Sequence, residues 1–245
     1  YFGSQIEHAK KIIIEVNETM PYTYGIKNHI HISQVDALVE NNHPIPSAPE
    51  PKLNEKDKKI GSIIADMIHD GDTIQVGIGA IPNAVMNNLK DKKNLGLHSE
   101  MFTSKAQLLH EEGVLVNTKK QNFKGVSIAT FAFGPSEMYE FMDHNSDILM
   151  VPSDLSNGQK YIAENNNFVS INSSVEIDFL GQVSSERIGD TYYSSTGGQA
   201  DFAKAVNLSK NGRGIIAMYS TAAKDKISTI VPKLHAGAPT TTHKN

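Results

Sequence analysis

Cysteine is absent from the 245 residues of this chain. The chain therefore forms no disulfide, offers no thiolate to a metal and has no cysteine nucleophile. This composition fits a reducing compartment, and we expect a cytoplasmic protein. No apolar run approaches the roughly 20 residues that a membrane-spanning helix needs. The first residues show no signal-peptide pattern, so we expect no membrane partner.

A block of basic residues is also missing. The formal net charge is −4, and we therefore expect no nucleic-acid partner. The GxSxG motif of serine hydrolases and the HExxH motif of zinc proteases do not occur either. What is present is an ordinary globular composition, with 39% hydrophobic and 20% charged residues. The chain is long enough for one large domain or two small ones.

Strand patterns alternate with helical patterns through most of the chain. This order is typical of an α/β protein with an open, mostly parallel sheet flanked by helices. One helix is predicted from Ile60 to Ile68, with Ile63, Ile64 and Met67 completing one apolar face, and it should stop at Asp70-Gly71. Further helices are predicted at 104–112, 135–142 and 200–208, and strands at 73–76, 95–98, 114–116, 126–133, 148–151, 168–171, 175–180, 214–219 and 227–231.

The first 52 residues give weaker patterns. A helix is predicted at Gln5–Lys11, a buried strand at the β-branched run Ile12–Val16, and a half-exposed strand at His29–Val35. His29 and His31 would share one face of that strand. No third ligand lies nearby in the sequence, so we expect surface or packing histidines and no metal site. The proline-rich stretch 42–51 predicts a linker and the best domain boundary.

The stretch from Thr73 to Glu100 predicts a βαβ unit, with a strand, a glycine turn, a helix and a second strand in that order. Its turn is formed by Gly77, Ile78, Gly79, Ala80 and Ile81, and Pro82 follows in the first helical turn. Glycines after a strand let a ligand approach the backbone, and the start of the next helix favours phosphate. On this motif alone, a tight turn packed against its sheet is an equally good interpretation.

A second glycine turn, Gly197-Gly198, precedes the helix predicted at 200–208. Two such turns in one sheet would hold a phosphate-bearing ligand from both sides, although each alone is also only a turn. Two glutamates lie at strand ends. Glu100 directly follows a strand, at the edge where α/β sheets bind ligands, whereas Glu176 alternates with Asp178 on a face expected to be solvated.

Six blocks in chain order carry a family resemblance: IGAIPNAV, KNLGLHSEMF, SINSSVEIDFLGQV, GGQADF, STAAKDKISTIVPKL and TTTHKN. With HIHISQVD near the start, they resemble the acetyl-CoA hydrolase/transferase family, especially its 4-hydroxybutyrate and butyrate–acetate CoA-transferases. The resemblance spans nearly the whole chain and implies a CoA-transferase fold of the NagB/RpiA-like type. It also implies a piece of a longer polypeptide. Residues 1–52 would be the tail of an N-terminal domain plus a linker, and 53–245 an incomplete catalytic C-terminal domain.

The resemblance implies an enzyme that moves CoA between a short-chain acyl-CoA and a carboxylate of the acetate, butyrate or 4-hydroxybutyrate type. The family's nucleophilic glutamate carries over to Glu100. Its CoA-binding segments carry over to Gly77–Ile81, to Gly197 and Gly198, and further to Lys224. Coenzyme A and acyl-CoA are then substrates, no cofactor is bound permanently, the second substrate is a small carboxylic acid, and the protein is a homo-oligomer. An acyl-CoA (acetyl-CoA) hydrolase and a CoA-binding module without turnover are the alternatives.

Three positions depart from the family's pattern. Ser195 replaces the first glycine of the GxGG turn, and His243 replaces the arginine of TTTR. The SDG that follows the glutamate motif reads Thr103-Ser104-Lys105, which should place a cation near the nucleophile. None of these changes removes Glu100.

The chemistry explains why a glutamate suffices. A glutamate side chain, with a reference pKa of about 4.3, is ionised at neutral pH and needs no general base to act as a nucleophile. A carboxylate is a weaker base than a thiolate by about 4 pKa units, so forming an acyl-glutamyl anhydride from a thioester is uphill by several kcal/mol. Binding energy from the remote end of CoA must offset this, and backbone N–H groups must stabilise the developing oxyanion.

Overall fold

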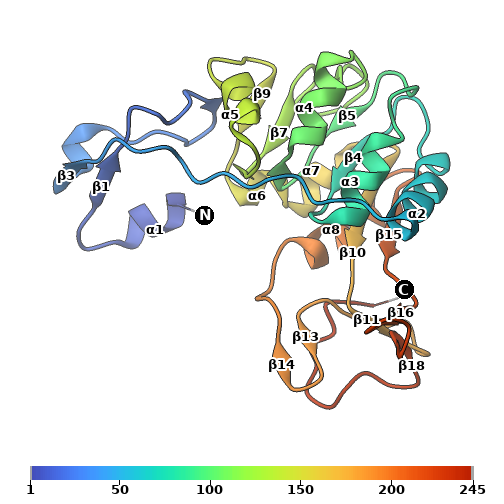
Figure 1. The fold of residues 1–245 in the computed structure, drawn as a ribbon. Coiled ribbons are helices and arrows are strands. Elements are labelled where there is room, and N and C mark those ends of the chain that lie inside the picture. Colours follow the sequence, from blue (N-terminus) through green and yellow to red (C-terminus); the bar gives the residue numbers. More distant parts are fainter. Residues whose placement is uncertain (1, 244–245) are drawn as a thin grey trace.

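The computed structural model describes residues 2–243 of the chain. Its centre is a sheet with helices on both faces (Figure 1). The strands of this sheet are β2 (Tyr24–Gly25), β4 (Thr73–Val76), β5 (Gly96–Leu97), β7 (Ser127–Ala129), β9 (Ile148–Met150), β10 (Phe168–Ser173) and β15 (Arg213–Ala217). They pair in parallel in the orders β15-β10-β4-β5 and β2-β9-β7. A parallel bridge between His98 and Ile128 joins the two groups, which confirms the open parallel sheet predicted from the sequence.

The helices form two layers that cover the two faces of the sheet. They are α2 (Glu55–Asp66), α3 (Ala80–Asn87), α4 (Ser104–Glu111), α5 (Ser136–Met142), α6 (Ser153–Ser156), α7 (Gln159–Glu164) and α8 (Gln199–Val206). Side chains alternate along β10, so Val169 and Ile171 join the core under α2 to α5. Phe168 points the other way and packs with Ile162 of α7 and Phe202 of α8.

The order of the strands places the candidate site. From β4, strands β5, β7 and β9 are added on one side in chain order, whereas β10 and β15 are added on the other side. The order therefore reverses between β4 and β10, and open α/β sheets bind ligands at the carboxyl end of such a switch point. The turn at Gly77 follows β4, and Glu100 follows β5 at the same edge.

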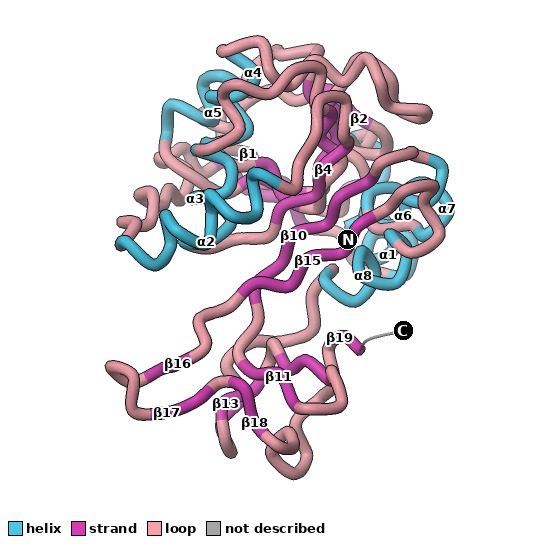
Figure 2. Tube along the Cα trace, turned by 90° about the vertical axis from the view of Figure 1, so that its right-hand side faces the viewer, coloured by secondary structure: helices cyan, strands magenta, loops and turns pink. Residues whose placement is uncertain are grey.

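A second, smaller lobe is formed by two parts of the chain, one between β10 and α8 and the other after β15. Its sheet has the order β18-β11-β12-β19 and lies below the main sheet in Figure 2. Asp178 of β11 is buried and accepts hydrogen bonds from the backbone N–H groups of Leu180 and Gln182, so its predicted solvated position is wrong. The strands of this lobe are β11 (Glu176–Asp178), β12 (Gln182–Ser184), β13 (Arg187–Ile188), β14 (Thr191–Tyr192), β16 (Thr221–Ala222), β17 (Ile227–Ser228), β18 (Ile230–Val231) and β19 (Thr242–His243).

The N-terminal segment, blue in Figure 1, reaches away from the sheet. It contains α1 (Phe2–His8), β1 (Ile13–Val16), the 3₁₀ helix η1 (Ile32–Gln34) and β3 (Ala37–Glu40). No residue from 2 to 56 is buried. The predicted burial of Ile12–Val16 is therefore wrong: β1 pairs with β3, and its residues remain exposed or only partly buried. The predicted strand at His29–Val35 is also wrong, because the His31 ring accepts a hydrogen bond from Ser33 N–H and starts η1.

Other elements differ from the prediction in register. Helix α2 starts at Glu55 behind an Asn54–Asp57 capping box and ends at Asp66, before the predicted stop. Its buried face contains Ile64, while Ile63 and Met67 are exposed. The predicted strand at 126–133 divides into β7 and β8 (Phe131–Ala132), which pairs with β6 (Met101–Phe102). Helices α6 and α7 were not predicted. No helix within the described chain has the length and apolarity to cross a membrane.

Candidate active site

Glu100 is fixed at the end of the strand that carries it. Its backbone carbonyl accepts hydrogen bonds from Thr130 N–H at 2.8 Å and Phe131 N–H at 3.1 Å. Its side-chain Oε2 accepts a hydrogen bond from Gly198 N–H at 3.1 Å. The structure thus brings together the predicted nucleophile and the second glycine turn, which lie 98 residues apart in the sequence.

Gly198 makes this contact possible because it has no side chain. A Cβ added there would overlap Glu100 Oε2 and lie 2.5 Å from Asn157 Nδ2. Gly198 is also the N-cap of α8 and has no capping side chain, so unpaired N–H groups and the positive end of the helix dipole lie beside the carboxylate. The turn is therefore shaped to hold negative charge on the Glu100 carboxylate.

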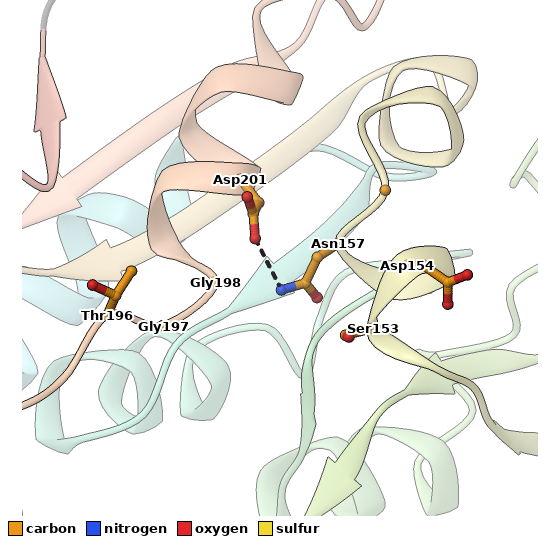
Figure 3. A pocket seen from close by; sticks show the side chains of 8 residues that line it. Ser153, Asp154, Asn157, Thr196, Gly197, Gly198 and Asp201 are labelled. Atoms are coloured by element: carbon orange, nitrogen blue, oxygen red, sulfur yellow. Dashed lines mark hydrogen bonds between the residues drawn. The ribbon is translucent and has the colours of Figure 1, made fainter. Parts of the chain in front are cut away.

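A cavity of about 390 Å³ lies beside this contact. Figure 3 shows that the turn and the first residues of α8 form one wall, and the segment after β9 forms the other. The Asn157 amide bridges the two walls by donating a hydrogen bond to Asp201 Oδ2 at 3.3 Å. The residues that line the cavity are Ser153, Asp154, Asn157, Gly158, Thr196, Gly197, Gly198 and Asp201.

The orientation of Asn157 is set by its neighbours. Its Oδ1 accepts a hydrogen bond from the Ser156 hydroxyl at 2.8 Å, which leaves its Nδ2 facing Asp201. The Ser156 and Thr130 hydroxyl oxygens lie 2.5 Å apart. Thr130 is the donor in this pair, because the Ser156 proton is directed to Asn157. Sequence reasoning missed all of these residues, although Asp201 lies within the GGQADF block that carries the family resemblance.

Two buried basic side chains support the strand that leads to Glu100. Lys120 Nζ donates hydrogen bonds to the carbonyls of Leu97 at 2.9 Å and Val126 at 2.8 Å, and burial lowers the pKa of Lys120 to about 7. His98 Nε2 donates to the Ser156 carbonyl at 2.8 Å. Burial, together with the nearby Lys120, lowers the pKa of His98 to about 3, so the ring is neutral and structural at physiological pH.

The first glycine turn lies next to Glu100 along the sheet edge. Gly77 N–H donates to the Ile171 carbonyl at 2.8 Å, and the Ser99 hydroxyl donates to the Val76 carbonyl at 3.2 Å. Gly79 has a φ of +118°, a conformation that glycine adopts without strain, and an added Cβ there would meet no heavy atom within 4 Å. The side chain of Ile78 is 65% exposed. This turn is therefore open to a ligand.

Lys224 lies apart from these groups. It is in the loop between β16 and β17, where Ala223, Lys224 and Asp225 all have positive φ. Its neighbour Asp225 forms an ion pair with Lys56 at the start of α2.

Lys105, the cation predicted near the nucleophile, forms an ion pair with Glu50 of the proline-rich segment at 2.6 Å. The Ser104 hydroxyl donates to the same carboxylate at 2.7 Å. Partial burial raises the pKa of Glu50, but the hydrogen bonds from Lys105 and Ser104 outweigh it and hold that pKa below its usual value. The side chain of His243 lies outside the described residues. In the described part of the chain, no group of three or more histidine and carboxylate side chains has the geometry to hold a metal.

The fold agrees with those of known proteins. Residues 134–245 match the family model described as the acetyl-CoA hydrolase/transferase C-terminal domain. This match, together with the relatives described below, confirms the family resemblance that the sequence blocks carry. The matched region includes Gly197, Gly198 and Lys224, whereas Glu100 and the first glycine turn precede it.

Individual relatives cover the whole chain. The 4-hydroxybutyrate coenzyme A transferase of Clostridium kluyveri is 46% identical over 100% of this chain and 57% of its own length. The crystal structure of RipA from Yersinia pestis, with 41% identity and a TM-score of 0.90, covers 97% of this chain and 53% of its own. The structure of 4-hydroxybutyrate CoA-transferase from Porphyromonas gingivalis, with 36% identity and a TM-score of 0.84, matches 96% of this chain and 56% of its own length. The chain thus has the CoA-transferase type of fold and spans about half the length of the relatives it matches.

Proposed function

We propose that this chain carries the nucleophile of a CoA-transferase, which moves CoA between a short-chain acyl-CoA and a carboxylate by ping-pong chemistry. The hydrogen bond from Gly198 N–H to Glu100 Oε2, beside a cavity, is the observation that carries the proposal. It joins a carboxylate at the ligand-binding edge of the sheet to a backbone donor at the start of a helix. The names of the relatives support CoA transfer as the reaction.

In the proposed reaction, the Glu100 carboxylate attacks the thioester carbonyl and expels the CoA thiolate, which leaves an acyl-glutamyl anhydride. The thiolate then attacks the Glu100 carbonyl carbon, releases the first carboxylate product and leaves a glutamyl-CoA thioester. An acceptor carboxylate attacks this thioester to form a new anhydride. The thiolate finally attacks the acceptor's carbonyl, which gives the new acyl-CoA and frees Glu100.

Gly198 N–H has a defined task in this sequence. Each attack on the Glu100 carbonyl carbon places negative charge on a carboxyl oxygen, and Gly198 N–H already faces Oε2. A preorganised backbone donor of this kind is worth roughly a hundredfold or more in rate. Gly77–Ile81, Gly197 and Lys224 are proposed CoA contacts, with the remote parts of CoA providing the binding energy that offsets the uphill first step.

The acceptor is proposed to be a small acid of the acetate, butyrate or 4-hydroxybutyrate type, and the protein a cytoplasmic homo-oligomer. Residues 1–52 are proposed to belong to a separate unit that precedes the catalytic part at 53–245. Two observations support this division: no residue from 2 to 56 is buried, and residues 41–54 contain neither helix nor strand. Strand β2 departs from it, because β2 pairs with β9 of the main sheet.

The test is to trap the glutamyl intermediate on the complete gene product that contains this chain. The protein is incubated with an acyl-CoA, quenched with hydroxylamine and digested, and the peptide that contains Glu100 is examined by mass spectrometry. We expect a hydroxamate on Glu100, with product formation that requires acetate. If Glu100 is labelled but CoA is released equally fast without acetate, the protein is a hydrolase. If the peptide is still labelled in Glu100→Ala, the proposed mechanism is ruled out.

A further inference from the structure

Glu186 joins three segments of the smaller lobe. Its side chain is 8% exposed. One carboxylate oxygen accepts a hydrogen bond from the Thr196 hydroxyl and the other from the Thr241 hydroxyl, both at 3.2 Å. Its backbone carbonyl accepts from the N–H groups of Tyr193 and Ser194, which closes the hairpin formed by β13 and β14. This residue has no part in the chemistry described above.

A buried carboxylate is expensive unless its oxygens are hydrogen-bonded. Among the side chains that the structure describes, no cation pairs with Glu186. The adjacent Arg187 instead forms an ion pair with Asp190. The two threonine hydroxyls therefore supply the side-chain hydrogen bonds described for this carboxylate, and one of them comes from the turn that contacts Glu100.

Thr196 stands two residues before Gly198. Figure 3 shows its hydroxyl on the side of the turn away from Asn157 and Asp201. Gly197, which stands between Thr196 and Gly198, has open space around it, since an added Cβ would meet no heavy atom within 4 Å. Packing therefore does not fix the middle of the turn. Its position depends on the anchors to either side, which are Thr196 on Glu186 and Gly198 against Glu100.

We infer that Glu186 is a positioning residue for the proposed CoA-transfer reaction. It holds the Thr196 hydroxyl, and through it the turn, so that Gly198 N–H stays directed at the Glu100 carboxylate. Glu186 does not line the cavity and touches no reacting atom. The inference rests on the proposed function, because the rate effect requires that Glu100 be the nucleophile.

The expected effect is on the rate constant rather than on substrate binding. A displacement of about 1 Å at a reacting group costs up to roughly a hundredfold in rate. We expect Thr196→Val and Glu186→Ala to lower kcat by about 10- to 100-fold while KM for acyl-CoA changes by less than about threefold. Glu186→Gln should keep most of the activity. Its amide oxygen accepts from one hydroxyl, and its N–H donates to the other, because threonine hydroxyls rotate to suit their partners.

Thr241→Val is the matched control. It removes the other hydroxyl on the same carboxylate, but Thr241 is next to β19 and not in the turn. Because the Thr241 hydroxyl also accepts from Ser185 N–H at 3.0 Å, we expect it to lower the thermal midpoint at least as much as Thr196→Val while leaving kcat within about threefold of the wild type. Amide hydrogen exchange of the peptide that contains Gly198 gives a readout that needs no turnover. Exchange should be faster in Thr196→Val and Glu186→Ala than in the wild type or Thr241→Val.

Two results would overturn the inference: an unchanged kcat and unchanged exchange in folded Thr196→Val, or Glu186→Gln as slow as Glu186→Ala. Failure of the proposed function would look different. The wild type would then show no acyl-CoA turnover and no label on Glu100, while the contrast in hydrogen exchange among the variants would still show whether Glu186 holds the turn.

Discussion

Glu100, the proposed nucleophile, is held by two sets of hydrogen bonds, one to its backbone carbonyl and one to its carboxylate. Glu100→Gln keeps an oxygen that accepts from Gly198 N–H but removes the proposed nucleophile. We expect kcat to fall by on the order of 10³-fold or more with no loss of folding. Steady-state CoA transfer and the thermal midpoint measure the two effects. Glu176→Gln, the other glutamate at a strand end, is the control and should retain activity; the reverse result would move the nucleophile to Glu176.

The two glycines of the second turn differ sharply in the space around them. Gly198→Ala would press a methyl group against Glu100 Oε2 and Asn157 Nδ2. We expect kcat to fall by roughly a hundredfold, the value of one oxyanion donor. Gly197→Ala meets no protein atom, so any loss there should appear in KM for acyl-CoA and not in kcat. Equal effects of the two substitutions on kcat would contradict the geometry.

Residue by residue, the sequence pattern pointed to two glutamates at strand ends, Glu100 and Glu176, because a strand end is a local feature, and the family resemblance selected Glu100. It did not point to Asn157 or Glu186. Asn157 forms a hydrogen bond with Asp201, 44 residues away, and Glu186 forms one with Thr241, 55 residues away. Neither residue lies in a motif whose spacing indicates its partner, so only the folded chain reveals these contacts.

The buried Lys120 ammonium donates a hydrogen bond to the carbonyl of Leu97 in β5. Its lowered pKa predicts that the stability of the fold depends on pH. The unfolded chain holds the Lys120 proton up to its usual pKa of 10.5, whereas the folded protein loses it near 7. Between these values the unfolded state binds more protons, so the free energy of unfolding rises with pH, by up to about 1.4 kcal/mol per pH unit. Below the folded pKa both states are protonated, and Lys120 adds no further slope.

Urea unfolding between about pH 7 and about pH 9 would measure this slope. In Lys120→Met, a side chain of similar length without a charge, the dependence should be flatter. His98, whose pKa Lys120 also lowers, is neutral in the folded protein over this range, so the difference between the two slopes reports mainly on Lys120. Identical slopes would show that Lys120 remains protonated in the folded state.

At the level of elements, predictions held where burial is continuous and failed where exposure varies. Strands β4 (TIQV) and β10 (FVSINS) mix apolar and polar residues but are buried along both faces, except at Ser173, and the sequence alone indicates them as strands. Helix α2 has apolar residues on more than one face, so the pattern placed Ile63 and Met67 in the core, whereas the buried face is centred on Ile64. The pattern at His29–Val35 alternates like a strand, but the local bond from Ser33 N–H to His31 favours η1.

The whole molecule brings together what the sequence could only place in order. Pattern and resemblance predicted a parallel sheet, but not that β10 and β15 would be added beside β4 on the side opposite β5. That reversal creates the switch point between β4 and β10. The ends of β4 and β5 lie at the same edge because these strands are parallel neighbours. The chain leaves β10, runs through the smaller lobe and re-enters the main part at α8, where the Gly197-Gly198 turn contacts Glu100.

The contrast between the two parts of the chain predicts their local stabilities. Every residue of β4 is buried, whereas β1 and β3 have no buried residue. Hydrogen exchange in this chain should therefore protect the amides of β4 and β10 at least about a thousandfold more than those of β1 and β3. Equal protection from exchange would mean that another segment or a second copy of the chain covers β1 and β3. Repeating the exchange after dilution would identify a second copy as the cover, because protection by self-association falls with protein concentration.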